Sequence, residues 1–387
     1  MQDPLALRSD ARRILALARR DRAAAGKAMA ELSAEEQVAV VCDAPVQHRD
    51  ELLGLLPAPE HVIPLLPEAE FCFTVKASGL ESATWILEYA TPEQVVASLD
   101  LDAWSGHAPD CASLDAWLSA LAETSDPALL RSVHAIHPEL LVLYLRDHVA
   151  VIQKPDDDEG WQPPEGAQTL EGRFYFVALR ENDDIAAVLR LLHLLFQNDY
   201  WTYFRMLQGV IWELESANQE WARRWRIGRL EDLGFPPWEE AMSLYRYMKP
   251  EQRAAIGDGD NPLDIAEWHL PVWMPSLPEG HDSRHLIFRT IAKLSPEERQ
   301  ATFYAFVAIA NKVAVADQME LSDAETTPKA IEKAAVWISK GLEYVAAENA
   351  LDAMQVVRRA SLERLFRVGA NLDPERARGQ AVVREAE

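Results

Sequence analysis

Apolar and polar positions along this chain recur with helical spacing in many short segments. Residues 185–196 are apolar nearly all round, which is typical of a buried helix. Residues 201–229 continue as one or two helices, which Gly234 and Pro236 are expected to end. Near the C-terminus, apolar residues alternate at spacings of four and three, as in packed helices: Ile331, Ala335, Ile338, Leu342 and Val345. The pattern predicts an all-α protein.

Capping residues mark the predicted helix starts, and most of them precede a proline. A residue before proline favours the extended backbone that a cap needs, and proline itself suits the first helical turn. The predicted caps are Ser33, Thr91, Asp126, His137, Asn261, Ser295, Thr327 and Asp373. Four openings, at Ser33, Thr91, Lys249 and Ser295, share acidic or amide residues in the first turn. They indicate either a structural repeat or the common composition of capped helix starts.

One segment interrupts the helical pattern. Residues 156–168 are acidic and rich in proline and glycine, which predicts an exposed loop. Residues 149–152 and 173–177 on either side are β-branched or aromatic, so they predict a single β-hairpin, unless the first is the end of a helix. We therefore expect a superhelical array of short helices in residues 1–150, an acidic linker with the hairpin in 151–180, and a larger helical domain in 181–387.

Two stretches resemble the motifs of a bacterial family. LESATWILEYATPEQVVASLDLDAW (residues 80–104) has the form A-[ST]-P-E-Q-hydrophobic, followed by L-D-hydrophobic-D-x-W. GRLEDLGFPPWEEAMSLYRYM (residues 228–248) has the form R-L-x-D-x-G-F-P, followed by E-A-x-x-x-Y. Both resemble domain-of-unknown-function family 6178, over roughly residues 65–248 and more weakly in the C-terminal helices. That resemblance implies no particular activity.

A looser likeness concerns the short helices opened by proline and glutamate. They are similar to the cytoplasmic N-terminal domain of bacterial magnesium transporters and to the middle domain of the flagellar rotor switch protein. Both are right-handed superhelices of short helices that work by contact with other protein surfaces. The likeness implies a superhelical array with a protein partner.

Composition narrows the possible partners and the compartment. The chain has 387 residues, 49% of them hydrophobic, and a formal net charge of −24, which fits a folded protein that repels nucleic acid and anionic lipid. The longest apolar run, residues 303–310, is too short to cross a bilayer, so no membrane insertion is expected. Cys42, Cys72 and Cys111 are odd in number and unpaired in sequence, which favours reduced thiols. With no signal peptide apparent, we expect a cytoplasmic protein.

The most charged stretch of the chain offers two hypotheses. Glu213, Glu220 and Arg224 are spaced by seven and four, which predicts one helical face and, on an enzymatic hypothesis, an active site beside residues 223–229. Ion pairing within the helix between Glu220 and Arg224 explains the same spacing without catalysis. On the binding hypothesis, aromatic and arginine side chains form a contact surface for another protein. Its members are Trp221, Arg223, Trp225, Arg226 and Arg229.

Metal and cofactor motifs are weak in this sequence. His134 and His137 precede a predicted helix start, and the pair His281 and His285 lacks the glutamate of a zincin. The acidic run 156–159 lacks the alternation of a calcium loop. With no glycine-rich phosphate loop or nucleophile motif apparent, we predict no metal and no cofactor. The leading hypothesis is a non-enzymatic scaffold or regulator that binds another protein; the alternative is an enzyme of unknown class.

Overall fold

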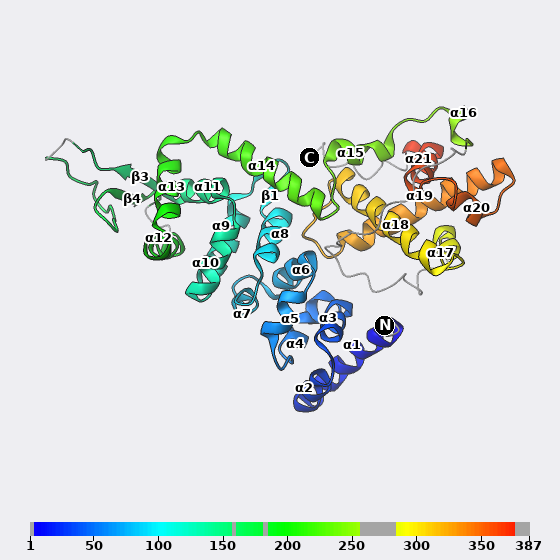
Figure 1. Ribbon diagram of the computed structural model, residues 1–387, viewed down its shortest axis with the longest axis horizontal. Helices are drawn as coiled ribbons and strands as arrows, with labels where there is room; N and C mark the ends of the chain where they lie inside the picture. The colour runs from blue at the N-terminus through cyan, green and yellow to red at the C-terminus, as the bar shows by residue number, and fades with distance from the viewer. Residues whose placement is uncertain (1–3, 157–159, 181–184, 256–283, 376–387) are drawn as a thin grey trace. The chain divides into compact units, whose positions relative to one another are not determined.

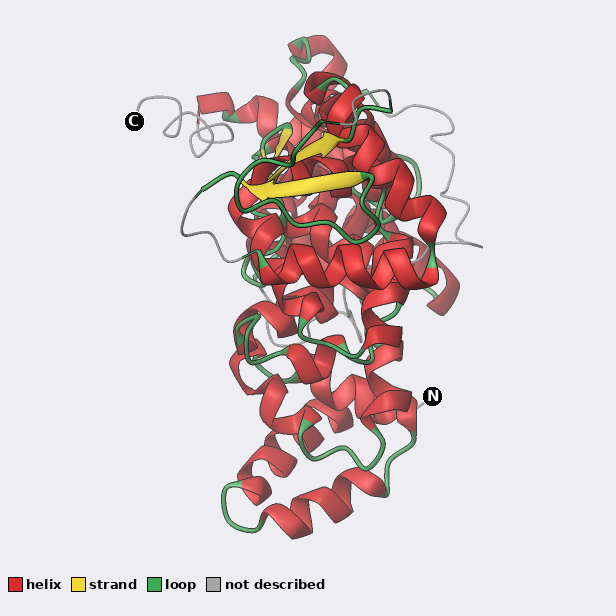
Figure 2. Cartoon of the chain, turned by 90° about the vertical axis from the view of Figure 1, so that its left-hand side faces the viewer, coloured by secondary structure: helices red, strands yellow, loops and turns green. Residues whose placement is uncertain are grey.

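The structure is a computed structural model that describes residues 4–156, 160–180, 185–255 and 284–375. Helices, including three short 3-10 helices, make up 69% of these residues (Figures 1 and 2), so the prediction of an all-α protein is confirmed. The chain forms two compact units, Met1–Arg229 and Leu230–Glu387, and each is described by itself. Among the described residues, no helix combines the length and apolar character that a membrane crossing requires.

The first unit is a series of mostly short helices. They are α1 (Pro4–Ala18), α2 (Arg22–Ala30), α3 (Ala34–Asp43), α4 (Arg49–Leu53), α5 (Pro59–Val62), α6 (Glu68–Ser78), α7 (Thr84–Leu87), α8 (Pro92–Asp102), α9 (Cys111–Ala122), α10 (Asp126–Ala135), α11 (Pro138–His148), α12 (Ala186–Asn198), α13 (Tyr200–Trp212) and α14 (Glu215–Asp232). The short 3-10 helices Val46–His48 and Ile63–Leu65 lie between them. Figure 1 shows this succession from α1 to α14.

Several of the predicted caps are observed. Ser33, Thr91 and Ser295 each form a capping box with the third residue of the helix that follows. His137 occupies the cap position of α11, without a hydrogen bond from its side chain to the helix. Asn261 lies outside the described residues.

Two of the predicted caps, Asp126 and Thr327, are wrong by one position or more. The cap of α10 is Ser125 rather than Asp126, because the Ser125 hydroxyl accepts the hydrogen bond from the backbone of Ala128. Thr327 lies inside α19, which begins at Thr326. Asp373 follows the last residue of α21, and the described residues after it, Pro374 and Glu375, are helical, so its predicted place before a helix start is observed.

Two buried glutamines near helix starts bind carbonyl groups of earlier segments. The side-chain amide of Gln37 donates to the carbonyls of Met29 and Leu32, at 3.0 and 2.9 Å. That of Gln94 donates to the carbonyls of Ile63 and Leu66, both at 2.8 Å. Each amide donates to carbonyls at the end of a helix or a 3-10 helix, where backbone partners are few. The contacts are alike, while a true structural repeat remains a prediction.

The predicted hairpin is confirmed. Strand β3 (Val149–Gln153) pairs antiparallel with β4 (Phe174–Ala178), with Val149 opposite Ala178 and Gln153 opposite Phe174. A second, smaller pair joins β1 (Trp104–Ser105) to β2 (Ala108–Pro109). Strand β3 packs against α13. The first unit therefore includes the predicted linker and hairpin, residues 151–180. Figure 2 shows the strands lying over helices.

The second unit is built around two long helices. Its elements are α15 (Trp238–Ala241), the 3-10 helix Met242–Tyr245, α16 (Pro250–Arg253), α17 (Leu286–Ile291), α18 (Pro296–Ala316), α19 (Thr326–Asn349), α20 (Ala353–Val357) and α21 (Leu362–Leu372). The predicted apolar stripe of α19 packs in the core of this unit, where Ile338 and Leu342 are fully buried. Gly234 has φ +84°, as expected for the end of the preceding helix.

Helices α19 and α21 cross with their backbones in contact. A Cβ atom on Gly341 would lie 1.9 Å from the carbonyl oxygen of Leu365, and one on Gly369 would lie 1.9 Å from that of Trp337. No side chain fits at either position, because the atoms that it would meet are backbone atoms of the other helix. Glycine is therefore required here by close approach rather than by an unusual φ.

We predict that Gly369→Ala lowers the free energy of unfolding by at least about 2 kcal/mol, since the added methyl group must push the two helices apart. Urea unfolding followed by circular dichroism measures the effect. Gly228→Ala is the matched control, because a Cβ on this helical glycine meets nothing within 4 Å. The control is expected to be neutral or stabilising by about 0.5–1 kcal/mol. Equal effects of the two substitutions would contradict the close crossing.

Candidate partner-binding site

The charged stretch is divided between two helices. Helix α13 ends at Trp212, and Glu213 follows in an extended conformation, with φ −81° and ψ 148°, before α14 begins at Glu215. The Arg146 guanidinium donates to three carbonyls at this end of α13, including that of Glu213 at 2.5 Å. The prediction that Glu213 shares a helical face with Glu220 and Arg224 is wrong, because the chain turns at Glu213.

Helix α14 is held on α8 by a buried ion pair. The Arg229 Nε and Nη2 atoms donate to the two carboxylate oxygens of Asp100, at 2.6 and 2.8 Å. Only 1% of Asp100 is exposed. Burial raises the pKa of the Asp100 carboxyl, and the hydrogen bonds from Arg229 oppose that rise. A bidentate contact of this kind fixes both the position and the orientation of the arginine.

Arg226 makes a second connection one turn earlier. Its Nε donates to the backbone carbonyl of Asp100 at 2.8 Å, and its guanidinium lies 4.9 Å from the ring centre of Trp104. Burial lowers the pKa of Arg226 to about 10. Both arginines were predicted to bind a partner, but their guanidinium groups contact Asp100 and its neighbours. We therefore assign Arg226 and Arg229 the role of positioning α14.

The two motif stretches of the sequence meet in this contact. Asp100 and Trp104 belong to the first stretch, and Arg229 begins the R-L-x-D segment of the second. Asp102, also in the first stretch, accepts a hydrogen bond from the Trp117 indole at 2.8 Å. The first motif therefore supplies the acidic and aromatic groups that Arg226 and Arg229 contact.

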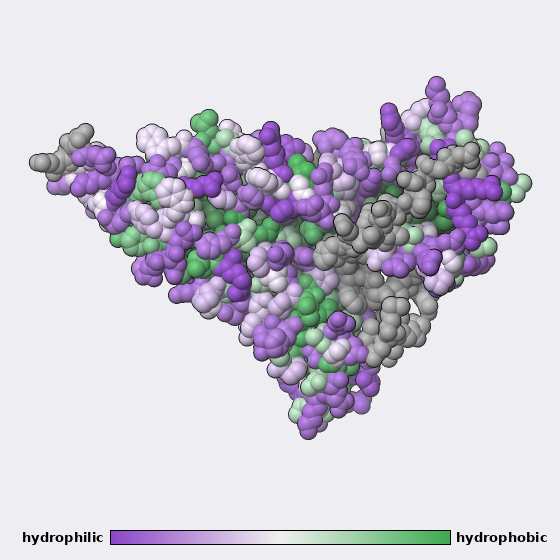
Figure 3. All heavy atoms as spheres, viewed as in Figure 1, coloured by the Kyte–Doolittle hydropathy of each residue, from purple (hydrophilic) through white to green (hydrophobic). Residues whose placement is uncertain are grey.

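Helices α13 and α14 and the link between them carry six exposed large hydrophobic side chains. The exposed fractions are 73% for Trp201, 70% for Trp212 and 72% for Leu214. The group that we call the aromatic surface consists of Tyr200, Trp201, Trp212, Leu214, Trp221 and Trp225. These are six of the eleven large hydrophobic residues that are exposed in the described part of the chain. In Figure 3, pale and green residues lie among the purple ones along the upper edge, over α13 and α14.

The two tryptophans of α14 have partly fixed rings. Trp225 stacks on the imidazole of His137, with ring centres 4.5 Å apart and an angle of 17° between the planes. The Arg224 guanidinium lies 5.2 Å from the ring centre of Trp221. Half of each indole remains accessible, at 49% for Trp221 and 47% for Trp225. These contacts limit the motion of the two rings.

The acidic and basic groups on the outer face of α14 pair with each other. Glu220 accepts a hydrogen bond from Arg224 at 2.9 Å, as the spacing of four predicts. Arg223 lies 4.0 Å from the same carboxylate. The Arg224 side chain is 61% exposed, so the pair contributes only a few tenths of a kcal/mol, about 0.3–0.5.

The candidate metal ligands have other partners. His134 lies 3.1 Å from Asp199, and His285 lies 3.1 Å from Glu332. His137 lies 3.2 Å from Glu139 and stacks on Trp225. Within the described ranges, no three histidine, cysteine, aspartate or glutamate side chains are grouped so that they could hold a metal ion. His281 and residues 157–159 lie outside those ranges.

Sequence reasoning found part of the aromatic surface. It named Trp221 and Trp225 but missed Tyr200, Trp201 and Trp212. The residue type alone does not show whether an aromatic side chain is exposed or, like that of Trp117, fully buried. Asp100 was also missed as the partner of the arginines. Its place within the L-D-hydrophobic-D-x-W motif was the available signal, but a motif does not identify the residue that an acid pairs with.

Comparison with family models places the chain. The model described as "Family of unknown function (DUF6178)" matches residues 26–375. The chain therefore belongs to this family, as its two motif stretches suggest. Comparison with curated proteins gives no match. Comparison with solved structures also gives none.

We predict that Arg229→Met lowers the free energy of unfolding by about 3–5 kcal/mol, because it leaves the Asp100 carboxylate buried without its partner. Adding Asp100→Leu should recover most of the loss, and urea unfolding of both variants gives the coupling energy. Arg224→Met is the matched control, because it removes an exposed arginine of the same helix and should cost less than about 1 kcal/mol. Additive effects of the Arg229 and Asp100 substitutions would contradict the buried pair.

Proposed function

We propose that this member of the DUF6178 family is a non-enzymatic scaffold or regulatory module, which binds another protein through the aromatic surface. The observation that carries the proposal is that two successive helices, α13 and α14, carry four exposed tryptophans, of which Trp201 and Trp212 are 73% and 70% exposed. Apolar side chains that stand singly on a surface need no explanation, whereas a group of them marks an interaction site. Tryptophan is also the residue that most often contributes strongly to binding when a partner covers it.

The contacts that fix helix α14 and the Trp225 ring favour the same function. Arg226 and Arg229 hold α14 on α8, and Trp225 rests against His137. A surface whose backbone is already fixed loses less conformational freedom when it binds. The anchoring therefore lets the exposed indole rings meet a partner at a lower entropic cost.

The charges at the edge of this surface indicate the chemistry of the partner. Arg224 is exposed beside Trp221, and Arg223 lies next to it on the helix. The chain as a whole carries a net charge of −24, so a strongly acidic partner would be repelled elsewhere. We propose a partner with an apolar centre and a few carboxylates at its edge, which the arginines can meet.

Two further parts of the proposal concern the array and the compartment. We propose that the short helices of residues 1–150 form a superhelical repeat, supported by the like contacts of Gln37 and Gln94. We propose a cytoplasmic location, supported by three free cysteines. Two of them are buried, and burial raises the pKa of the Cys72 thiol to about 12.

The enzymatic alternative places a pocket around Glu213, Glu220 and residues 223–229. Its expectation of one helical face for the two glutamates is not met, because Glu213 lies in the link between α13 and α14. Glu220 is already paired with Arg224.

We predict that Trp212→Ser with Trp221→Ser abolishes the recovery of specific partner proteins when the tagged chain is purified from its native cell, because the partner loses the apolar groups that it covers. Quantitative mass spectrometry compares the variant with the wild-type chain. The matched control is Leu65→Ser with Leu372→Ser, which removes two exposed apolar side chains, 52% and 38% exposed, from other helical segments. The control should recover the same proteins as the wild-type chain. Equal recovery by both double variants would contradict the proposal.

A further inference from the structure

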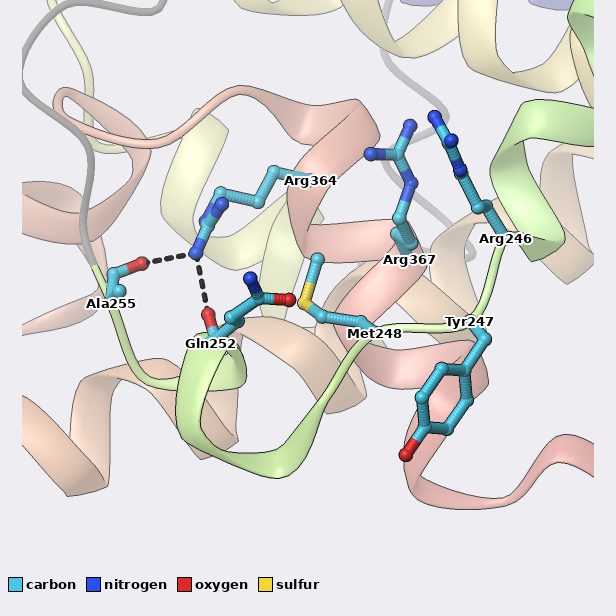
Figure 4. A pocket seen from close by; sticks show the side chains of 7 residues that line it. All are labelled: Arg246, Tyr247, Met248, Gln252, Ala255, Arg364 and Arg367. Atoms are coloured by element: carbon cyan, nitrogen blue, oxygen red, sulfur yellow. Dashed lines mark hydrogen bonds between the residues drawn. The ribbon is translucent and has the colours of Figure 1, made fainter.

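The second unit contains a pocket lined by three arginines. It has a volume of about 400 Å³ and lies between the segment after the 3-10 helix Met242–Tyr245 and helix α21. Figure 4 shows its lining residues: Arg246, Tyr247, Met248, Gln252, Ala255, Arg364 and Arg367. In that view, Arg246 and Arg367 extend in the same direction, and Arg364 extends toward the backbone of Gln252 and Ala255. None of the lining residues is acidic.

The arginines of this pocket have little negative charge to balance them. Within the described residues, the side chains of Arg246 and Arg364 have no carboxylate partner. Arg367 donates to Glu363 at 2.7 Å, but Glu363 also pairs with Lys312 at 3.1 Å. Like charges that line one pocket repel each other, and a bound anion relieves that repulsion.

One of the arginines is already fixed in place. The Arg364 Nη2 atom donates to the carbonyls of Gln252 and Ala255, at 2.7 and 2.6 Å. Its Nε is buried and has no hydrogen-bond partner among the described residues. Arg367 is held in a similar way, because its Nε donates to the carbonyl of Ser243 at 3.1 Å.

The pocket also has an aromatic edge. Tyr247 lines it and is 68% exposed, and Met248 lies next to Tyr247 in the lining. An exposed ring beside guanidinium groups can stack on a planar group of the ligand. The volume is in the range of sites for small organic molecules.

We propose that this pocket binds the phosphate group of a small phosphorylated molecule that also carries a ring. Guanidinium groups match the oxygens of a phosphate in pairs, and a dianion offsets the charge of two arginines. Arg364 and Arg367 form the fixed part of the site, and Arg246, which extends beside Arg367, adds a guanidinium group without a fixed partner in the described part of the chain. The ring of the ligand stacks on Tyr247. This site is separate from the aromatic surface, and the two proposals are tested independently.

The test is isothermal titration calorimetry of the full chain at low ionic strength, with phenyl phosphate, inorganic phosphate and phenol as probes. We expect phenyl phosphate to bind more tightly than inorganic phosphate, and phenol to show no binding. Arg246→Gln should weaken both phosphate probes by about tenfold, since one charged hydrogen-bonding group is lost. Tyr247→Ala should weaken phenyl phosphate alone.

The choice of variants separates a binding role from a structural one. Arg246 makes no side-chain contact with the fold that is described, so its substitution should leave the circular dichroism spectrum unchanged, whereas Arg364 also holds the backbone. Arg359→Gln is the matched control, because Arg359 is an exposed arginine of the same unit. It should bind both probes as the wild-type chain does. Absence of binding by the wild-type chain, or equal weakening by the Arg246 and Arg359 substitutions, would overturn the proposal.

Discussion

The arrangement of the candidate binding surface depends on a buried ion pair. Asp100 lies at the end of α8 with its carboxylate removed from water, and Arg229 meets it with two hydrogen bonds of 2.6 and 2.8 Å. A charge buried in this way is costly without its partner, so the pair acts mainly as a constraint on where α14 can lie. Arg226 adds a second contact one turn away, on the backbone of Asp100. With these two arginines turned toward α8, the rest of α14 leaves Trp221 and Trp225 about half exposed.

Two groups of arginines in this acidic chain differ in whether a carboxylate partner lies nearby. Where a buried carboxylate is within reach, as at Asp100, the guanidinium positions a helix. Arg246 and Arg364 have no carboxylate partner among the described residues, and we propose that their charge serves a ligand. The helices beneath that pocket are held by another constraint, the backbone contact at Gly341 and Gly369. In the first unit the Asp100–Arg229 pair supports the proposed partner-binding surface. In the second unit the close crossing at Gly341 and Gly369 supports the proposed ligand pocket.

Much of the fold could be predicted from the sequence because its signals are local. Capping at Ser33, Thr91 and Ser295 depends on residues within one turn, and the hairpin depends on two short β-prone segments. The site was harder to predict because its contacts join residues far apart in the chain. Arg226 and Arg229 are in a basic stretch that is compatible with a free binding surface, and their burial follows only from Asp100, more than a hundred positions earlier. Glu213 was misplaced for a related reason: the break between α13 and α14 has no proline or glycine to mark it.

The most direct test of the central claim is site-specific photo-cross-linking in the native cell. A photoreactive amino acid is placed in turn at Trp212, at Trp221 and at Leu65, which is 52% exposed and lies outside α13 and α14. If the aromatic surface holds a protein partner, positions 212 and 221 should give the same cross-linked product, and position 65 should not give it. A product that forms equally from all three positions, or from position 65 alone, would contradict the account.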